Sequence, residues 1–214
     1  TQAGTFNFTA KVTDSATRSA TKAFALAITT VTAPNVVVII TDDQGWGDVG
    51  YHTPAGQVPI QTPNMDSFAT TGIRLERFYA TTVCSVTRST LMTGRNAIRH
   101  GTNNERGLDL SEHLMPQTFK AAGYQTFMCG KWHNTPAADN VPGGNRHNWP
   151  SQRGFDNFHG FMDGETHHFF PSRLMRDNQL IPMDAYPPDY YSGDDWMDQG
   201  IRYVQELRES HPSK

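Results

Sequence analysis

The sequence predicts an α/β fold, in which helices alternate with the strands of a mostly parallel sheet. Two observations over residues 34–214 support this prediction. A continuous β-branched run at 36–40 is typical of a strand that is buried on both faces of a parallel sheet. Helix-like and strand-like stretches then alternate along the chain, as expected when helices cover a sheet. In such folds the functional groups lie at the carboxyl ends of the strands.

The first 31 residues differ from the rest and predict a β-hairpin. Apolar residues alternate with polar ones over 6–12 and again over 24–28, and the polar turn 14–18 separates the two runs. Two strands alone are only marginally stable, so we expect this hairpin to pack on further structure. The Thr-rich pattern resembles the last two strands of the bacterial immunoglobulin-like modules that are often fused to secreted enzymes. We therefore assign residues 1–33 to the end of such a module and its linker.

Helices and strands are expected in order along the remaining chain. Residues 63–70 predict a helix that opens with Pro in its first turn and closes at Gly72, and 73–80 suits a strand. A helix over 84–93 comes next. The later elements are a helix at 116–122 ended by Gly123, a strand at 124–129, a surface loop at 134–150, and an amphipathic helix whose apolar face carries Trp196, Gly200, Ile201, Val204 and Leu207.

Composition and charge exclude some classes of function. The chain has 214 residues, a net charge of −3 and 11% aromatic residues, which is typical of a globular protein. No basic stripe indicates nucleic-acid binding, and the longest apolar run is far shorter than the roughly 20 residues that a membrane-spanning helix needs. The two cysteines do not form a disulfide framework, and Cys129 has no partner if Cys84 is used chemically.

A Cys and an Arg lie one helical turn apart at the expected start of the helix 84–93. The side chains of Cys84 and Arg88 can therefore face the same point in space. A helix N-terminus also offers free N–H groups and a partial positive charge, which suit an anion. Together these features predict a site for a tetrahedral oxyanion, and the alternative is a packed thiol near a surface cation.

Two further strand ends carry chemical groups. Asp42 and Asp43 follow the run 36–40, and adjacent carboxylates of this kind are ligands for calcium, although Asp is also common in solvated turns. Lys131 and His133 follow the strand 124–129 and point to one face, where they can bind an anion and move a proton. The alternative for this second pair is an exposed polar strand end.

The order of these groups resembles that of the sulfatase family. Residues 34–48 are similar to its opening strand and metal loop, and 62–75 to the helix and strand that follow. Cys84 to Gly94 is similar to the first sulfatase signature, 123–133 to the second, and Arg153-Gly154-Phe155-Asp156 continues the match. The resemblance covers 34–208. It implies an alkaline-phosphatase-like fold, with a mixed, mostly parallel sheet flanked by helices, of which residues 34–214 are the N-terminal part.

In that family the motif Cys is converted to formylglycine, whose hydrate is the nucleophile, and the resemblance implies the same for Cys84. The other implied roles are binding of Ca²⁺, or alternatively Mg²⁺, by Asp42, Asp43 and the residue made from Cys84, support of the formylglycine by Arg88, sulfate binding by Lys131, and contact with the hydrated aldehyde by His133. The implied substrate is a sulfated carbohydrate or an aryl sulfate. The implied partner is a formylglycine-generating or sulfatase-maturing enzyme.

Some residues depart from the family pattern. Val86 and Thr87 stand where the motif usually has Pro, less often Ala, and then Ser. Since Pro presents the Cys to the modifying enzyme in an extended segment, an unmodified Cys84 in an inactive homologue is an alternative. Gly164 stands where some arylsulfatases have Ser. The candidates for lining the substrate pocket, with a solvated loop as their alternative, are Glu165, His167 and His168.

The sequence is therefore consistent with three functions. The first is a calcium-dependent hydrolase of sulfate monoesters, the second a phosphonate monoester or phosphodiester hydrolase of the same superfamily, and the third a non-catalytic binding module. The family takes its remaining metal ligands and leaving-group acid from the second half of its fold, beyond Lys214. We therefore expect this chain to be part of a longer protein. A periplasmic or extracellular location follows by analogy with such fusions.

Overall fold

The structure is a computed structural model whose residues form two compact units, Thr1–Thr41 and Asp42–Lys214. The residues that it describes are 4–13, 15–28, 33–55, 57, 60–103, 105–141 and 143–211.

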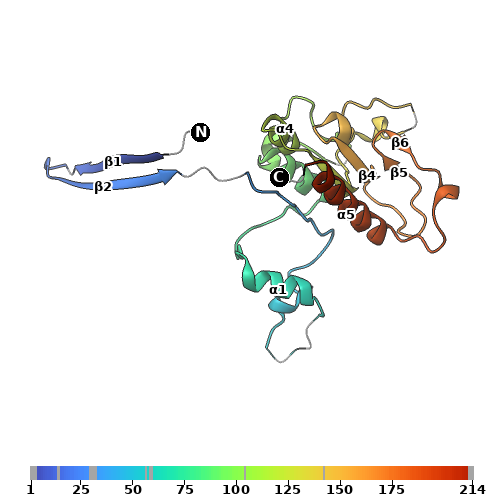
Figure 1. Cartoon of the computed structure of the whole chain (residues 1–214), viewed down its shortest axis with the longest axis horizontal. Coiled ribbons are helices and arrows are strands. Elements are labelled where there is room, and N and C mark those ends of the chain that lie inside the picture. Colours follow the sequence, from blue (N-terminus) through green and yellow to red (C-terminus); the bar gives the residue numbers. More distant parts are fainter. Residues whose placement is uncertain are drawn as a thin grey trace. The chain divides into compact units, whose positions relative to one another are not determined.

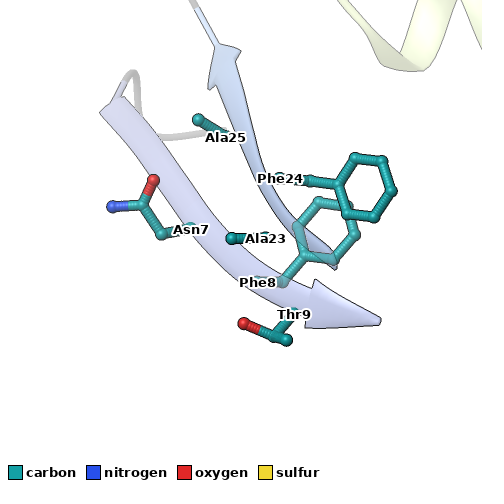
Figure 2. Close-up of a pocket in the computed structure, with 6 residues that line it drawn as sticks. All are labelled: Asn7, Phe8, Thr9, Ala23, Phe24 and Ala25. Atoms are coloured by element: carbon teal, nitrogen blue, oxygen red, sulfur yellow. The ribbon is translucent and has the colours of Figure 1, made fainter. Parts of the chain in front are cut away.

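The first unit contains an antiparallel hairpin, drawn in blue in Figure 1. β1 (Gly4–Thr13) pairs with β2 (Ser19–Ile28) along its whole length, so the hairpin prediction is confirmed. The ring of Phe8 stacks on that of Phe24 with centroids 5.3 Å apart, and Figure 2 shows both rings on one side of the ribbon. Of the predicted turn 14–18, Asp14 lies outside the described residues.

Two predicted strands are not formed. Residues 36–40 make no strand, and their side chains are 39–77% exposed. Residues 73–80 also make no strand, and a turn joins Phe78 N to Leu75 O within them. Both predictions are wrong for the same reason. β-branched and aromatic residues favour an extended backbone, but a strand exists only through hydrogen bonds to a neighbouring strand, and no described strand pairs with either run.

The second unit contains a mixed sheet in the strand order β3-β4-β5-β6. β3 (Phe127–Lys131) runs parallel to β4 (Asn157–Phe161). β5 (Leu174–Arg176) is antiparallel to β4, and β6 (Gln179–Leu180) is antiparallel to β5. The sheet and its helices confirm the α/β prediction.

The predicted strand at 124–129 forms, but β3 begins three residues later. Gly123 N and Tyr124 N donate to the carbonyls of Lys120 and Phe119, so these two residues close the preceding helix instead of joining the strand. At the other end β3 extends to Lys131.

The predicted helices are all present, with small changes at their ends. The described α-helices are α1 (Pro63–Thr71), α2 (Cys84–Thr93), α3 (Ala97–His100), α4 (Met115–Ala121) and α5 (Ser192–Ser210), of which α3 was not predicted. Short 3-10 turns lie at Gly50–His52, Ala137–Asp139, Pro150–Gln152 and Met183–Ala185. None of the helices in the described ranges has the length and apolarity needed to cross a membrane.

Helix α5 packs on β3 and β4, as Figure 1 shows in red. The ring of Trp196 stacks on Phe161, and that of Tyr203 stacks on Phe127. The predicted apolar face is wrong in part, because Ile201 and Val204 are 55% and 51% exposed. Ser192 and Gln199 are buried instead. Asp195, whose side chain is 24% exposed, pairs with His159 Nε2 at 2.6 Å.

The core of the second unit centres on Trp132, which is fully buried together with Phe158, Leu108 and Leu114. The predicted surface loop at 134–150 is irregular as expected, but its surface location is wrong for several residues. The described buried residues of this loop are Asn134, Thr135, Asn140, Asn148, Trp149 and Pro150. Trp132 Nε1 donates to the carbonyl of Asn148, so this buried carbonyl of the loop has a partner.

Candidate active site

The site is built around the first turn of α2, which begins at Cys84 as predicted. The N-cap residue, Val83, is extended and makes no side-chain cap, so the N–H groups of the first turn are not used by a capping side chain. Gly94 ends the helix in the left-handed conformation at φ 65°. A helix start of this kind has the N–H donors and the partial positive charge that suit an anion, and it lies at Cys84.

Thr87 fixes the segment that leads into α2. Its Oγ1 donates to the carbonyl of Thr81 at 3.0 Å and accepts from Thr81 N at 3.2 Å. The two threonine hydroxyls also lie 2.7 Å apart. A hydroxyl at this position therefore closes the chain ahead of Cys84 into a compact turn.

The side chains of Cys84 and His133 meet across the site. Cys84 Sγ lies 3.2 Å from His133 Nδ1, and His133 follows β3 with a left-handed φ of 52°. Burial lowers the pKa of His133, and the positive charges of Lys131 and Arg88 lower it further, against the opposing effect of Asp42. The imidazole is therefore neutral at pH 7, and it can accept a proton.

Asp42 contacts two cationic side chains, Lys131 and Arg88, next to Cys84 and His133. Its Oδ2 accepts from Lys131 Nζ at 2.7 Å and lies 3.5 Å from Arg88 Nη2. Burial acts to raise the pKa of Asp42, but the hydrogen bond from Lys131 and the two positive charges outweigh it, so the pKa is lowered. Asp42 is therefore ionised at neutral pH, and three charged groups lie together beside Cys84.

Lys131, the last residue of β3, and His133 point to one face and Trp132 points to the other, as the strand periodicity predicts. Lys131 and His133 reach the site, whereas Trp132 points into the core. Arg88 Nη1 donates to the carbonyl of Lys131 at 2.5 Å, and Ser89 Oγ donates to Asn134 Oδ1 at 2.7 Å. These two bonds join α2 to the end of β3.

Asp42 and Asp43 have the donor chemistry of a hard-cation site. Asp43 is exposed and has a left-handed φ of 52°. Calcium takes 6–8 oxygen ligands, so the two carboxylates are of a type that fits this ion and would supply part of its shell. Within the described ranges, no group of three or more His, Cys, Asp or Glu side chains is placed to hold a metal ion.

The three residues predicted to line the substrate pocket, Glu165, His167 and His168, make different contacts. Glu165 is exposed and close enough to His133 for its charge to favour the protonated imidazole. His167 Nδ1 instead accepts from the backbone N–H groups of Phe169 and Phe170, which closes its own turn. His168 Nδ1 lies 2.7 Å from the hydroxyl of Ser192 at the start of α5.

Sequence reasoning missed a polar cavity that adjoins His133. The cavity has a volume of about 180 Å³, and its lining includes Asn140, Asp163, Gly164 and Arg173. Gly164 packs directly on His133, because a Cβ atom there would lie 2.8 Å from the imidazole Cε1. The one sequence feature that pointed to this contact was Gly164 itself, which stands where some arylsulfatases have Ser. The other residues lie in loops, and no spacing rule connects them.

Comparison with known proteins places the chain in a family with this arrangement. The sequence model of the family "Sulfatase" matches residues 34–213. The chain therefore belongs to the sulfatase family, and its fold is the alkaline-phosphatase-like α/β fold expected from the sequence.

Particular relatives share part of the chain. Arylsulfatase J of Mus musculus is 32% identical over 193 residues, which are 85% of this chain and 30% of that protein. N-acetylgalactosamine-6-sulfatase of Rattus norvegicus is 40% identical over 115 residues, which are 47% of this chain and 21% of that protein. The chain thus spans less than a third of the length of either relative.

A solved structure with a sulfated sugar has the same fold. It is a protein in complex with its substrate D-glucosamine-2-N,6-O-disulfate, with a TM-score of 0.63 and 26% identity over 81% of this chain and 31% of that one.

Proposed function

We propose that the protein hydrolyses sulfate monoesters through a formylglycine residue made from Cys84. The observation that carries this proposal is the contact between Cys84 Sγ and His133 Nδ1, beside the Asp42–Lys131–Arg88 cluster. In the net reaction water cleaves the S–O bond of the ester and releases an alcohol and inorganic sulfate. Membership of the sulfatase family and the sulfated substrate of a structural neighbour support this assignment.

The formylglycine would supply a nucleophilic hydroxyl group at the start of α2. The site fits such a residue, since position 84 is half-buried and His133 Nδ1 lies within hydrogen-bonding distance of its side chain. His133, neutral at pH 7, accepts the proton of a hydroxyl there.

The cations of the site act on the sulfate group. Lys131 and Arg88 offset the negative charge that a sulfate monoester brings, and the uncapped first turn of α2 adds N–H donors. Both side chains are nearly buried, with exposed fractions of 9% and 8%, so solvent screens their charges little. Asp42 and Asp43 would hold a calcium ion, or a magnesium ion in its place, with further ligands from outside the described residues.

The same proposal covers the organisation of the protein. Residues 1–33 are the end of an immunoglobulin-like module and residues 34–214 the N-terminal part of the catalytic domain. The protein acts in the periplasm or outside the cell, and a formylglycine-generating or sulfatase-maturing enzyme converts Cys84 despite Val86. The hairpin β1–β2 and the family match from residue 34 support this division.

The first test is the mass of the tryptic peptide that runs from Phe78 to Arg88 in protein from its native host. The mass of a formylglycine peptide supports the proposal. An intact thiol at Cys84 would contradict the formylglycine mechanism and favour a non-catalytic binding module.

The second test compares the full-length protein on an aryl sulfate and an aryl phosphodiester. We expect higher kcat/KM on the sulfate, and a preference for the phosphodiester would favour the alternative hydrolase. Replacing Lys131 by Met should lower kcat about 10²–10³-fold, as for other donors that stabilise developing charge. Lys120→Met is the matched control, because Lys120 is a surface lysine paired with Asp156.

A further inference from the structure

The cavity beside His133 forms a second compartment of the site. His133 and Gly164 belong to its lining, and the other lining residues come from the same two segments, one after β3 and one after β4. His133 also contacts Cys84, so a group bound at Cys84 and a group in the cavity share this imidazole as a wall. The cavity therefore adjoins the residue that contacts Cys84, and it is the candidate place for the alcohol part of an ester whose sulfate group is held at Cys84.

The lining of the cavity includes a hydrogen-bonded network of three side chains, Asn140, Asp163 and Arg173. Arg173 Nη2 donates to Asp163 Oδ1 at 2.5 Å, and Asn140 Nδ2 donates to the same oxygen at 2.5 Å. A second guanidinium nitrogen, Nη1, donates to the carbonyl of Asn140. The network fixes all three side chains before any ligand enters, which lowers the entropic cost of binding.

The network can both donate and accept further hydrogen bonds. A guanidinium has five N–H donors, and the two bonds above use two of them. A carboxylate has about four acceptor positions, and the two bonds to Asp163 use only its Oδ1. Sugar hydroxyl groups donate and accept at once, so such a network matches them better than it matches a flat apolar ring.

The charge of the network and the volume of the cavity further limit the kind of molecule that can bind there. Asp163 balances the charge of Arg173, so the network does not offer an uncompensated cation to a second anionic group. The volume of about 180 Å³ is smaller than the roughly 300–1,000 Å³ of pockets for drug-sized ligands. A single sugar ring is therefore a better match than an oligosaccharide.

We propose that this cavity binds the hydroxyl groups of the sugar that carries the sulfate, with Asn140, Asp163 and Arg173 as its binding residues. The inference rests on the proposed sulfatase function and adds to it the class of alcohol that leaves. It assigns the substrate to the sulfated carbohydrates and not to the aryl sulfates.

The test measures kcat/KM of the full-length protein on N-acetylgalactosamine 6-sulfate, glucosamine 6-sulfate and 4-nitrophenyl sulfate. Replacing Arg173 by Met should lower the ratio of the better sugar value to the aryl value at least 10-fold. Ala137→Trp fills the cavity from an exposed position on its lining, and it should lower the same ratio without breaking an ion pair. Arg95→Met is the matched control, since it breaks the ion pair to Glu112 outside the cavity and should leave the ratio unchanged.

A readout without catalysis separates this inference from the proposed function. In a Cys84→Ala variant, calorimetric titration should show that unsulfated N-acetylgalactosamine or glucosamine binds, and that Arg173→Met weakens this binding at least 10-fold. The inference is overturned if neither sugar binds, or if both kinetic variants leave the ratio unchanged. If none of the three sulfate esters is hydrolysed while sugar binding is intact, the proposed function is overturned and the cavity assignment still stands.

Discussion

Replacing Ser89 by Ala tests whether α2 is held in place by one buried hydrogen bond. Ser89 and Asn134 are both fully buried, and the bond between their side chains is 2.7 Å long. Without the hydroxyl, Asn134 Oδ1 loses this donor in an environment that water does not reach. Leaving one buried polar group unsatisfied costs about 1–3 kcal/mol. For a unit spanning residues 42–214, this corresponds to a melting temperature lower by about 2–12 °C.

The assay is thermal unfolding followed by calorimetry and by tryptophan fluorescence, since Trp132 lies two residues from Asn134 in the sequence. Ser111→Ala is the matched control, because Ser111 donates a bond of the same length to Asp109 on the surface. Its effect should stay within about 0.5 kcal/mol. The double variant Ser89→Ala/Asn134→Leu should recover part of the loss, because it removes both partners. An equal effect of Ser89→Ala and its surface control would refute the reasoning.

Three further predictions concern close packing and pH. Gly164→Ala should displace His133 and lower kcat at least 10-fold with little loss of folded protein, which kinetics and circular dichroism together check. Gly160→Ala should prevent stable folding, because its Cβ would lie 1.9 Å from Gly130 O; soluble yield and circular dichroism would show native protein if this is wrong. Burial, and secondarily the charge of a nearby carboxylate, raise the pKa of Cys129 from 9.0 to about 11. The folded state therefore holds this proton more tightly, so its contribution to stability is complete below pH 9 and is lost as the pH rises through about 11. Urea unfolding at pH 8–11 should show this decline, and Cys129→Ala should reduce it.

The sequence was sufficient to predict the residues that meet at the site. Helical periodicity places Cys84 and Arg88 on one face, strand periodicity does the same for Lys131 and His133, and the family resemblance predicts that the two pairs meet. The same reasoning failed for 36–40 and 73–80. Their composition favours strands, but pairing depends on partners that local sequence does not specify.

The residues around the cavity were beyond prediction for a related reason. Asn140, Asp163 and Arg173 come from loops, where no period of 2 or 3.6 residues links position to direction. Tertiary contacts alone bring them together. The prediction for α5 was wrong in part because Asp195, whose side chain is 24% exposed, contacts β4 as a partner of His159, and hydrogen bonding makes a charged residue acceptable there.

The close approach of Gly130 and Gly160 gives the two parallel strands a fixed alignment. These glycines are opposite each other: a Cβ atom on Gly160 would lie 1.9 Å from Gly130 O, and Gly130 has a φ of 94°, which residues with a side chain rarely adopt. A shift of β3 by one residue would bring Cys129 or Lys131 opposite Gly160, and it would also turn each side chain of the strand to the other face. The two glycines thus help to fix the register of β3 against β4, and this register determines how far Lys131 and His133 extend past the edge of the sheet.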